Sequence, residues 1–229
     1  GHSLGEYVAA TVAGVMTFDE GLAAVAAQAR MLRERCAGCL LSVLAAPALF
    51  DQRRDVFDGL ALAGVNFAGN FVVSGAPARL DAAQAALDRL GHVAVRLPVR
   101  HGFHGPLVDA IRGELIAHAA QIRPRPARLP IYSACYAGVL PPATTERWAD
   151  YLWDVVREPI RFAELMAHAF SAPDDLYFVD LSASGSFANF LKHSYGARFR
   201  AAPVINQFGH NTATLDRLRH ELSGPSLRV

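Results

Sequence analysis

The chain has 229 residues, of which 52% are hydrophobic and 19% charged, and its 22 basic side chains almost cancel its 21 acidic ones. This composition excludes a disordered chain and predicts a large α/β domain, or a core with a small insert, that buries a substantial apolar interior. The near-neutral charge argues against a nucleic-acid partner, and no apolar run approaches the roughly 18 to 20 residues that cross a bilayer, so we expect no membrane partner either.

The first six residues, Gly1 to Glu6, form a G-x-S-x-G pattern. In this pattern a strand runs into a sharp turn that carries a serine and then continues into a helix. The turn forces an unfavourable backbone conformation on Ser3 and brings neighbouring chain segments so close that glycine is needed beside it. The sequence begins at the motif, so the preceding strand lies outside it. Ser3 is a candidate nucleophile.

Two helices are predicted after the turn, on either side of a break at 14–19, because apolar residues recur there at helical spacing. From residue 40 the pattern changes to short strands separated by helices that begin with proline. The expected strands are 40–44, 60–67, 71–74 and 93–99, the helices are 47–58 and 77–90, and a tight turn lies at 68–70. The order is therefore βαββαβ, the ferredoxin-like arrangement, which we interpret as a small inserted subdomain.

Beyond residue 100, helices alternate with buried strands. The expected strands are 130–134, 177–181 and 201–206, and the helices are 108–121, 144–156, 162–170, 187–195 and 212–222. Such alternation predicts a parallel sheet covered on both faces, with reactive groups beyond the carboxyl ends of its strands. We therefore expect an α/β fold with a parallel-sheet core, formed by residues 1–37 and 101–229, and a ferredoxin-like subdomain at 38–100.

A serine nucleophile requires a base, because its hydroxyl is hardly ionised at neutral pH. His104 lies where the insert returns to the core, and so borders any cleft between the two. A second arrangement also fits the pattern. In α/β-hydrolases the chain order is Ser, Asp, His, and in this sequence Asp180 ends one expected strand while His210 follows another. The residue pattern leaves both arrangements open.

The other reactive side chains favour structural roles. Cys36, Cys39 and Cys135 are too few for a disulfide framework, so we expect a reducing, cytoplasmic setting, and the chain start shows no secretory signal. The histidines show no metal-ligand spacing with cysteine or carboxylate, so neither a metal nor a bound cofactor is expected. The serine-rich loop 182–186 could hold a phosphate at a helix N-terminus, but an ordinary connecting loop is the favoured interpretation.

Five separated blocks of the sequence share their order and spacing with one family. The blocks are GHSLGE at 1–6, VN at 65–66 with VVSG at 72–75, FH at 103–104, REPIRF at 157–162 and FVDL at 178–181. They resemble the malonyl-CoA:acyl-carrier-protein transacylase family, and most closely the acyltransferase domains of polyketide synthases. The resemblance implies a hydrolase-like core with a ferredoxin-like insert. It also implies that part of the large subdomain, including a glutamine-bearing loop, lies upstream of Gly1.

The resemblance implies a Ser/His acyl-enzyme mechanism. Ser3 would be the nucleophile and His104 its base, with an acyl ester on Ser3 between two half-reactions. A backbone carbonyl, at the position of Val155, would orient the histidine, and the backbone N–H of Leu4 would hold the oxyanion. A second oxyanion donor would come from the upstream glutamine loop. Since one such donor is worth about 2.7 to 4 kcal/mol, we expect these residues alone to be weakly active or inactive.

Substrate choice depends on the position of Gln28, where malonyl-using members of the family carry an arginine that pairs with the free carboxylate. Arg30 lies on a different helix face and is no obvious substitute. Because a buried carboxylate without a cationic partner is costly, a non-carboxylated acyl thioester is the expected substrate. The segment 101–104, in which His101 and Phe103 precede the base, resembles the malonyl-selective form instead. We give Gln28 more weight, because only the arginine matches a carboxylate in charge.

The resemblance leaves three functions open. The first is an acyltransferase of polyketide or fatty-acid biosynthesis, the second an editing acyl hydrolase that removes stalled acyl groups from acyl carrier proteins, and the third a non-catalytic docking domain. The expected partners are an acyl carrier protein and an acyl-CoA or other phosphopantetheine thioester. Arg96, Arg100 and Arg198 are candidates for contact with the acidic surface of the carrier protein.

Overall fold

We describe the fold from a computed structural model of the chain, which describes residues 1–171, 176–196, 200–205 and 208–223. The chain divides into two compact units, residues 1–171 and 172–229, and each is described by itself. Within the described ranges, no helix combines the length and the apolar character that a membrane span requires.

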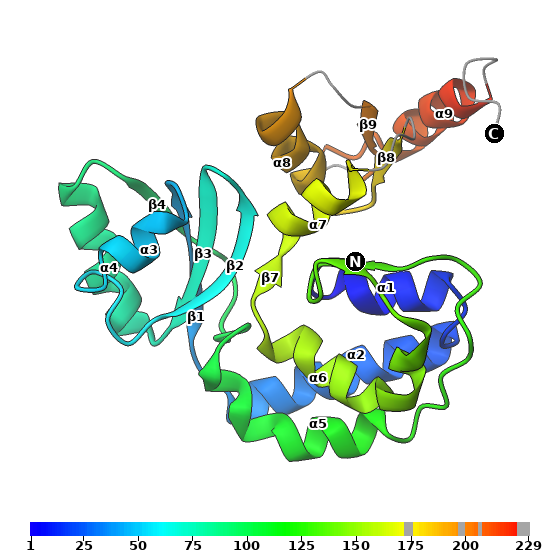
Figure 1. The fold of residues 1–229 in the computed structure, drawn as a ribbon, viewed down its shortest axis with the longest axis horizontal. Coiled ribbons are helices and arrows are strands. Elements are labelled where there is room, and N and C mark those ends of the chain that lie inside the picture. Colours follow the sequence, from blue (N-terminus) through cyan, green and yellow to red (C-terminus); the bar gives the residue numbers. More distant parts are fainter. Residues whose placement is uncertain (172–175, 197–199, 206–207, 224–229) are drawn as a thin grey trace. The chain divides into compact units, whose positions relative to one another are not determined.

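The two units are drawn in Figure 1. The elements of the first are α1 (Gly5–Val12), α2 (Phe18–Arg35), β1 (Cys39–Leu44), α3 (Ala48–Gln52), β2 (Ala61–Phe67), β3 (Asn70–Gly75), α4 (Pro77–Arg89), β4 (Val93–Arg96), η1 (Pro106–Ile111), α5 (Arg112–Ala119), β5 (Tyr132–Ser133), β6 (Gly138–Val139), η2 (Pro142–Arg147), α6 (Trp148–Arg157), β7 (Ile160–Arg161) and α7 (Phe162–Ala169). Those of the second are β8 (Tyr177–Asp180), α8 (Ser186–Tyr195), β9 (Arg200–Pro203) and α9 (Asn211–Leu222).

The predicted ferredoxin-like arrangement is confirmed between β1 and β4. The strands lie in the order β4-β1-β3-β2, all antiparallel, and β7 extends the sheet as a parallel neighbour of β2. Alternate residues of β1, such as Leu41 and Val43, are fully buried and pack with Phe71 and Leu80 in an apolar cluster of their own. α3 is shorter than expected, because the backbone leaves the helical region at Arg53.

Helices α1, α2, α5 and α6 of the first unit bury apolar side chains between them, among them Met31, Leu115 and Tyr151. α2 begins at a capping box, in which Thr17 and Glu20 exchange side-chain to backbone hydrogen bonds. The helices expected at 108–121 and 144–156 each begin instead with a 3₁₀ turn that carries proline in its first positions, η1 and η2.

The parallel sheet expected beyond residue 100 is only partly present among the described residues. β8 and β9 pair in parallel, as predicted. The expected strand 130–134 is reduced to β5, which pairs antiparallel with β6, because Ala137 takes a positive φ of 56° and turns the chain back. The main chain of Gly1 nevertheless bonds on both sides of Ser133, donating to Tyr132 O and accepting from Ala134 N, as in a parallel ladder.

Candidate active site

The G-x-S-x-G turn adopts the strained conformation that its sequence predicts. Ser3 has a positive φ of 51°, a region that residues with a side chain rarely occupy. A Cβ added to Gly1 would lie 2.5 Å from the Glu6 carboxylate and 2.7 Å from its Cα, so the close approach requires glycine there. The expectation that close approach requires glycine is wrong for Gly5, since no described atom lies within 4 Å of a Cβ added there.

Ser3 and His104 are brought together by the return of the chain from the small subdomain. The Ser3 Oγ lies 3.0 Å from His104 Nε2, which is hydrogen-bond distance. His104 is 3% exposed and has a positive φ of 56°. Its backbone N–H donates to Val156 O at 3.0 Å, which fixes the loop against the end of α6. Two strained residues, far apart in sequence, thus face each other.

The carbonyl that orients His104 belongs to Glu158, and the expectation of Val155 is wrong. His104 Nδ1 donates to Glu158 O at 3.0 Å. Glu158 follows the last residue of α6 and is extended, with φ −80° and ψ 152°, so its carbonyl turns away from the helix axis. Val155 lies inside α6, where carbonyls point along the axis. With Nδ1 protonated, Nε2 carries the lone pair that faces Ser3.

Burial lowers the pKa of His104 to about 4, which outweighs the opposing effect of the hydrogen bond to Glu158, and the nearby His2 lowers it further. The imidazole is therefore neutral at pH 7 and able to accept a proton. The backbone N–H of Leu4, expected to hold an oxyanion, donates no hydrogen bond to any described residue.

A functional position that the sequence did not single out is Glu6, whose carboxylate is 1% exposed. Its Oε1 accepts from Ser133 Oγ at 3.1 Å and from Ala134 N at 2.8 Å, and its Oε2 accepts from Tyr151 Oη at 2.8 Å. These bonds join the first turn of α1 to β5 and α6. The only sequence signal was a charged residue at the start of a largely apolar helix.

Gln28, the expected specificity position, lies on α2 and accepts a 2.6 Å hydrogen bond at Oε1 from Tyr7 Oη. Tyr7 is buried one helical turn beyond Ser3, and its burial raises its pKa. Among the described residues, the hydrogen bond from Tyr7 is the one that the Gln28 side chain makes. His101 Nδ1 donates to Cys36 O at 2.9 Å, and Phe103 packs against the rings of His101 and His104.

The alternative base arrangement receives no support from the local structure. The Asp180 carboxylate accepts from Ser182 N at 2.8 Å and from Ala188 N at 2.9 Å, so it fixes the loop that precedes α8. Ser182 Oγ accepts from Ser186 N at 3.1 Å. Three N–H groups of this loop and the start of α8, those of Ser182, Ser186 and Ala188, therefore already have acceptors, and the connecting-loop interpretation is favoured.

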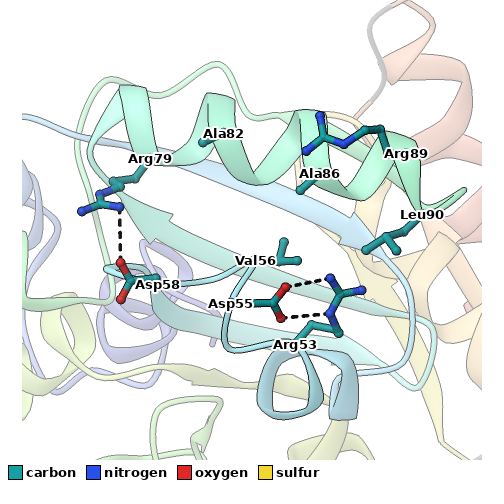
Figure 2. A pocket seen from close by; sticks show the side chains of 9 residues that line it. All are labelled: Arg53, Asp55, Val56, Asp58, Arg79, Ala82, Ala86, Arg89 and Leu90. Atoms are coloured by element: carbon teal, nitrogen blue, oxygen red, sulfur yellow. Dashed lines mark hydrogen bonds and ion pairs between the residues drawn. The ribbon is translucent and has the colours of Figure 1, made fainter.

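A groove of about 390 Å³ lies on the α4 side of the small subdomain and contains neither serine nor histidine. Figure 2 shows two ion pairs among the side chains that line it, Arg53 with Asp55 and Arg79 with Asp58. Exposed ion pairs of this kind contribute little binding energy. No group of three or more potential metal ligands occurs in the described part of the chain.

The candidate carrier-protein contacts differ in their surroundings. Arg96 is committed to Asp81 and to the carbonyl of Pro77, whereas Arg100 is exposed. Arg198 lies outside the described residues. The three cysteines are free thiols, and burial raises the pKa of Cys135 to about 12, so it stays protonated.

Comparison with known proteins identifies the family of the chain. The sequence model of the family described as "Acyl transferase domain" matches residues 1–221. The chain belongs to the acyl transferase domain family. It is 33% identical over 228 residues to the polyketide biosynthesis acyltransferase homolog BaeD of Bacillus velezensis, covering 98% of this chain and 69% of that protein. It is 36% identical over 225 residues to the polyketide biosynthesis protein ThaF of Burkholderia thailandensis, covering 95% of this chain and 19% of that protein.

Solved acyltransferase structures match this acyl transferase domain closely in fold. The acyltransferase domain from module 8 of the salinomycin polyketide synthase superposes with a TM-score of 0.86 at 29% identity, over 95% of this chain and 52% of that one. A loading acyltransferase from the avermectin polyketide synthase gives a TM-score of 0.87 at 26% identity, over 96% of this chain and 71% of that one. The acyl transferase chain thus spans about half the length of the first of these structures.

Proposed function

We propose that this acyl transferase domain carries an acyl group as an ester on Ser3, taken from a CoA or carrier-protein thioester and passed to the phosphopantetheine thiol of an acyl carrier protein. The observation that carries the proposal is the 3.0 Å contact between Ser3 Oγ and His104 Nε2. The relatives named as polyketide biosynthesis proteins support polyketide biosynthesis as the setting. The thioester donor and the carrier-protein partner are what the resemblance of the sequence blocks implies.

In the first half-reaction the Ser3 oxygen attacks the thioester carbonyl while its proton passes to His104 Nε2. The imidazolium that forms keeps its Nδ1–H on the Glu158 carbonyl. The Leu4 N–H stabilises the oxyanion of the tetrahedral intermediate. When the C–S bond breaks, His104 returns the proton to the departing thiolate. The second half-reaction runs the same steps in reverse with a new thiol.

The test is acylation of the full chain, followed by intact-protein mass spectrometry after incubation with acetyl-, butyryl- and malonyl-CoA. We expect a slowly formed adduct on the wild type, in keeping with the expected weak activity, none on Ser3→Ala, and acylation slowed by a further factor of about 10² to 10⁴ in His104→Ala, because the proton acceptor is lost. His220→Ala, which alters an exposed histidine of α9, is the matched control. The proposal fails if Ser3→Ala is still acylated or if His104→Ala keeps the wild-type rate.

We further propose that the acyl group lacks a free carboxylate. The support is Gln28, a neutral side chain that accepts from Tyr7 where the family's malonyl-using members have an arginine. A malonyl carboxylate would meet no guanidinium there, and a buried charge without a partner costs several kcal/mol.

Gln28→Arg should therefore raise malonyl loading relative to acetyl loading by at least tenfold, because the guanidinium pairs with the carboxylate. Gln121→Arg, at an exposed position, should leave the ratio unchanged. Rapid malonyl loading by the wild type would contradict the substrate assignment and leave the Ser3 mechanism intact. Release of free acid faster than transfer to a carrier protein would assign the chain to editing hydrolysis instead.

A further inference from the structure

A chain of hydrogen-bonded polar side chains runs from the residue before Ser3 into the sheet of the small subdomain. His2 Nε2 lies 3.3 Å from Asn66 Oδ1 on β2, and Asn66 Nδ2 donates to Asn70 Oδ1 on β3 at 2.8 Å. Asn70 Nδ2 donates in turn to Ser42 Oγ at 2.8 Å and to Val43 O at 3.0 Å on β1. We call His2, Asn66, Asn70 and Ser42 the polar chain.

The direction of every bond in the polar chain follows from its last acceptor. The Val43 carbonyl can only accept, so Asn70 must present Nδ2 to β1 and Oδ1 to Asn66. Asn66 must then donate through Nδ2, which leaves its Oδ1 facing His2. An amide oxygen can only accept, so His2 Nε2 must carry a proton. The acceptor that the small subdomain places opposite Nε2 thus favours the Nε2–H tautomer of His2, while the ring also bonds the backbone of His2 itself.

The two amide side chains of the polar chain are buried, since Asn66 is 8% and Asn70 4% exposed. They lie on the strands that carry the apolar cluster of the small subdomain. Buried amides of this kind gain little net stability over apolar side chains, but they specify a single arrangement once all their bonds are made. The arrangement that they specify ends on the ring of His2, which also packs edge-on against Phe162 with the ring centroids 5.5 Å apart.

We propose that His2 is a positioning residue, which uses its Nε2–H bond to Asn66 to hold the strained turn so that Ser3 Oγ faces His104. The proposal rests on the proposed role of Ser3. The segment that enters the turn is then held by two separate strands, through the Gly1 main chain on β5 and the His2 side chain on β2. His2 also stays uncharged, since burial lowers its pKa to about 4, and so adds no second positive charge beside the imidazolium of His104.

Two substitutions of His2 separate positioning from packing. His2→Leu removes the donor, whereas the amide of His2→Gln can place an N–H near the position of Nε2. We expect His2→Leu to slow Ser3 acylation at least tenfold with KM changed less than twofold, and His2→Gln to restore the rate to within threefold of wild type. Thermal unfolding of both variants identifies the temperature range in which they are folded. Equal acylation rates for His2→Leu and wild type would overturn the proposal.

A remote variant tests the polar chain itself. Asn70→Ala removes its third member, and we expect a three- to tenfold slower acylation, because Asn66 loses its fixed direction. Gln84→Ala is the matched control, since it removes a 3.0 Å side-chain bond to Ala94 O in the same subdomain without touching the polar chain. The proposal is wrong if Gln84→Ala slows acylation as much as Asn70→Ala does.

A spectroscopic measurement separates this proposal from the proposed function. In ¹⁵N-histidine spectra of the full chain near pH 7, His2 should be the Nε2–H tautomer, and that signal should change in Asn66→Ala. His2→Leu should also shift the His104 nitrogen signals, because the Ser3 contact is lost. A wild type that shows these signals but is never acylated would refute only the catalytic role of Ser3. An Nδ1–H tautomer at His2 would refute the positioning role, whatever the activity.

Discussion

At the scale of single residues, the site depends on two residues whose backbone has a positive φ, a conformation that only glycine adopts readily. Ser3 and His104 both have positive φ values, of 51° and 56°. Such strain costs of order 1 to 3 kcal/mol for each residue and persists only where the surroundings fix it. The main-chain bonds of Gly1 and the Val156 carbonyl provide that restraint. The strained turn and the strained loop together aim the hydroxyl at the imidazole.

This strain predicts an unusual order of stability at position 3. Ser3→Gly should be more stable to urea than Ser3→Ala by about 1 kcal/mol, because glycine adopts the positive φ without steric cost. At Ala23, an exposed position in the interior of α2, the order should reverse, with glycine about 1 kcal/mol less stable than alanine. If the glycine form is less stable to urea than the alanine form at both positions, Ser3 is not strained.

At the scale of elements, the anchoring of α1 decides where the nucleophile lies. Glu6 bonds to β5 and α6 through Ser133, Ala134 and Tyr151, so one carboxylate fixes the start of α1 against elements more than a hundred residues away. The expected helices include α1 and α6, whereas the expected strand 130–134 is reduced to β5, and nothing in the sequence patterns of these elements indicates this connection.

Glu6→Gln should lower the free energy of unfolding by about 2 to 4 kcal/mol, because an amide cannot accept all three hydrogen bonds and turns its NH₂ toward a donor. Urea unfolding followed by circular dichroism measures the effect. Glu34→Gln, an exposed change on α2, should stay within about 0.5 kcal/mol of wild type. If Glu6→Gln lowers the free energy of unfolding by less than about 0.5 kcal/mol, the carboxylate does not anchor the helix.

At the scale of the whole molecule, the two parts of the first unit meet where Gly38 and Gly102 cross. A Cβ on Gly38 would lie 2.8 Å from Gly102 N, so the chain enters and leaves the small subdomain through adjacent segments. His104 follows directly on this crossing and is buried there. Folding therefore removes an imidazole from water, and the stability of the fold becomes linked to its protonation.

His104 has a pKa of about 4 in the folded chain and about 6.5 when unfolded, so the unfolded chain binds more protons between these values. Its contribution to stability is complete above pH 6.5 and is lost as the pH falls toward 4. Between pH 7.5 and 5.0 the free energy of unfolding should fall by about 2 kcal/mol more in wild type than in His104→Gln. His220→Gln should behave as wild type. If the free energy of unfolding falls equally with pH in wild type and in His104→Gln, the imidazole is not buried and neutral.

The residue pattern left the base for Ser3 open between His104 and His210, and only the family resemblance favoured His104. The sequence by itself determined the local features: the helices, the βαββαβ order and the strained turn at Ser3. These follow from periodicity, from glycine and proline, and from residue chemistry, all of which act over short stretches of chain. Only the tertiary structure decided that Glu158 rather than Val155 faces His104, that Gln28 accepts from Tyr7, and that Asn66 reaches His2. Each of those contacts depends on where a helix ends or on which strands become neighbours, and such positions are fixed by packing between distant segments, which leaves no periodic mark on the sequence.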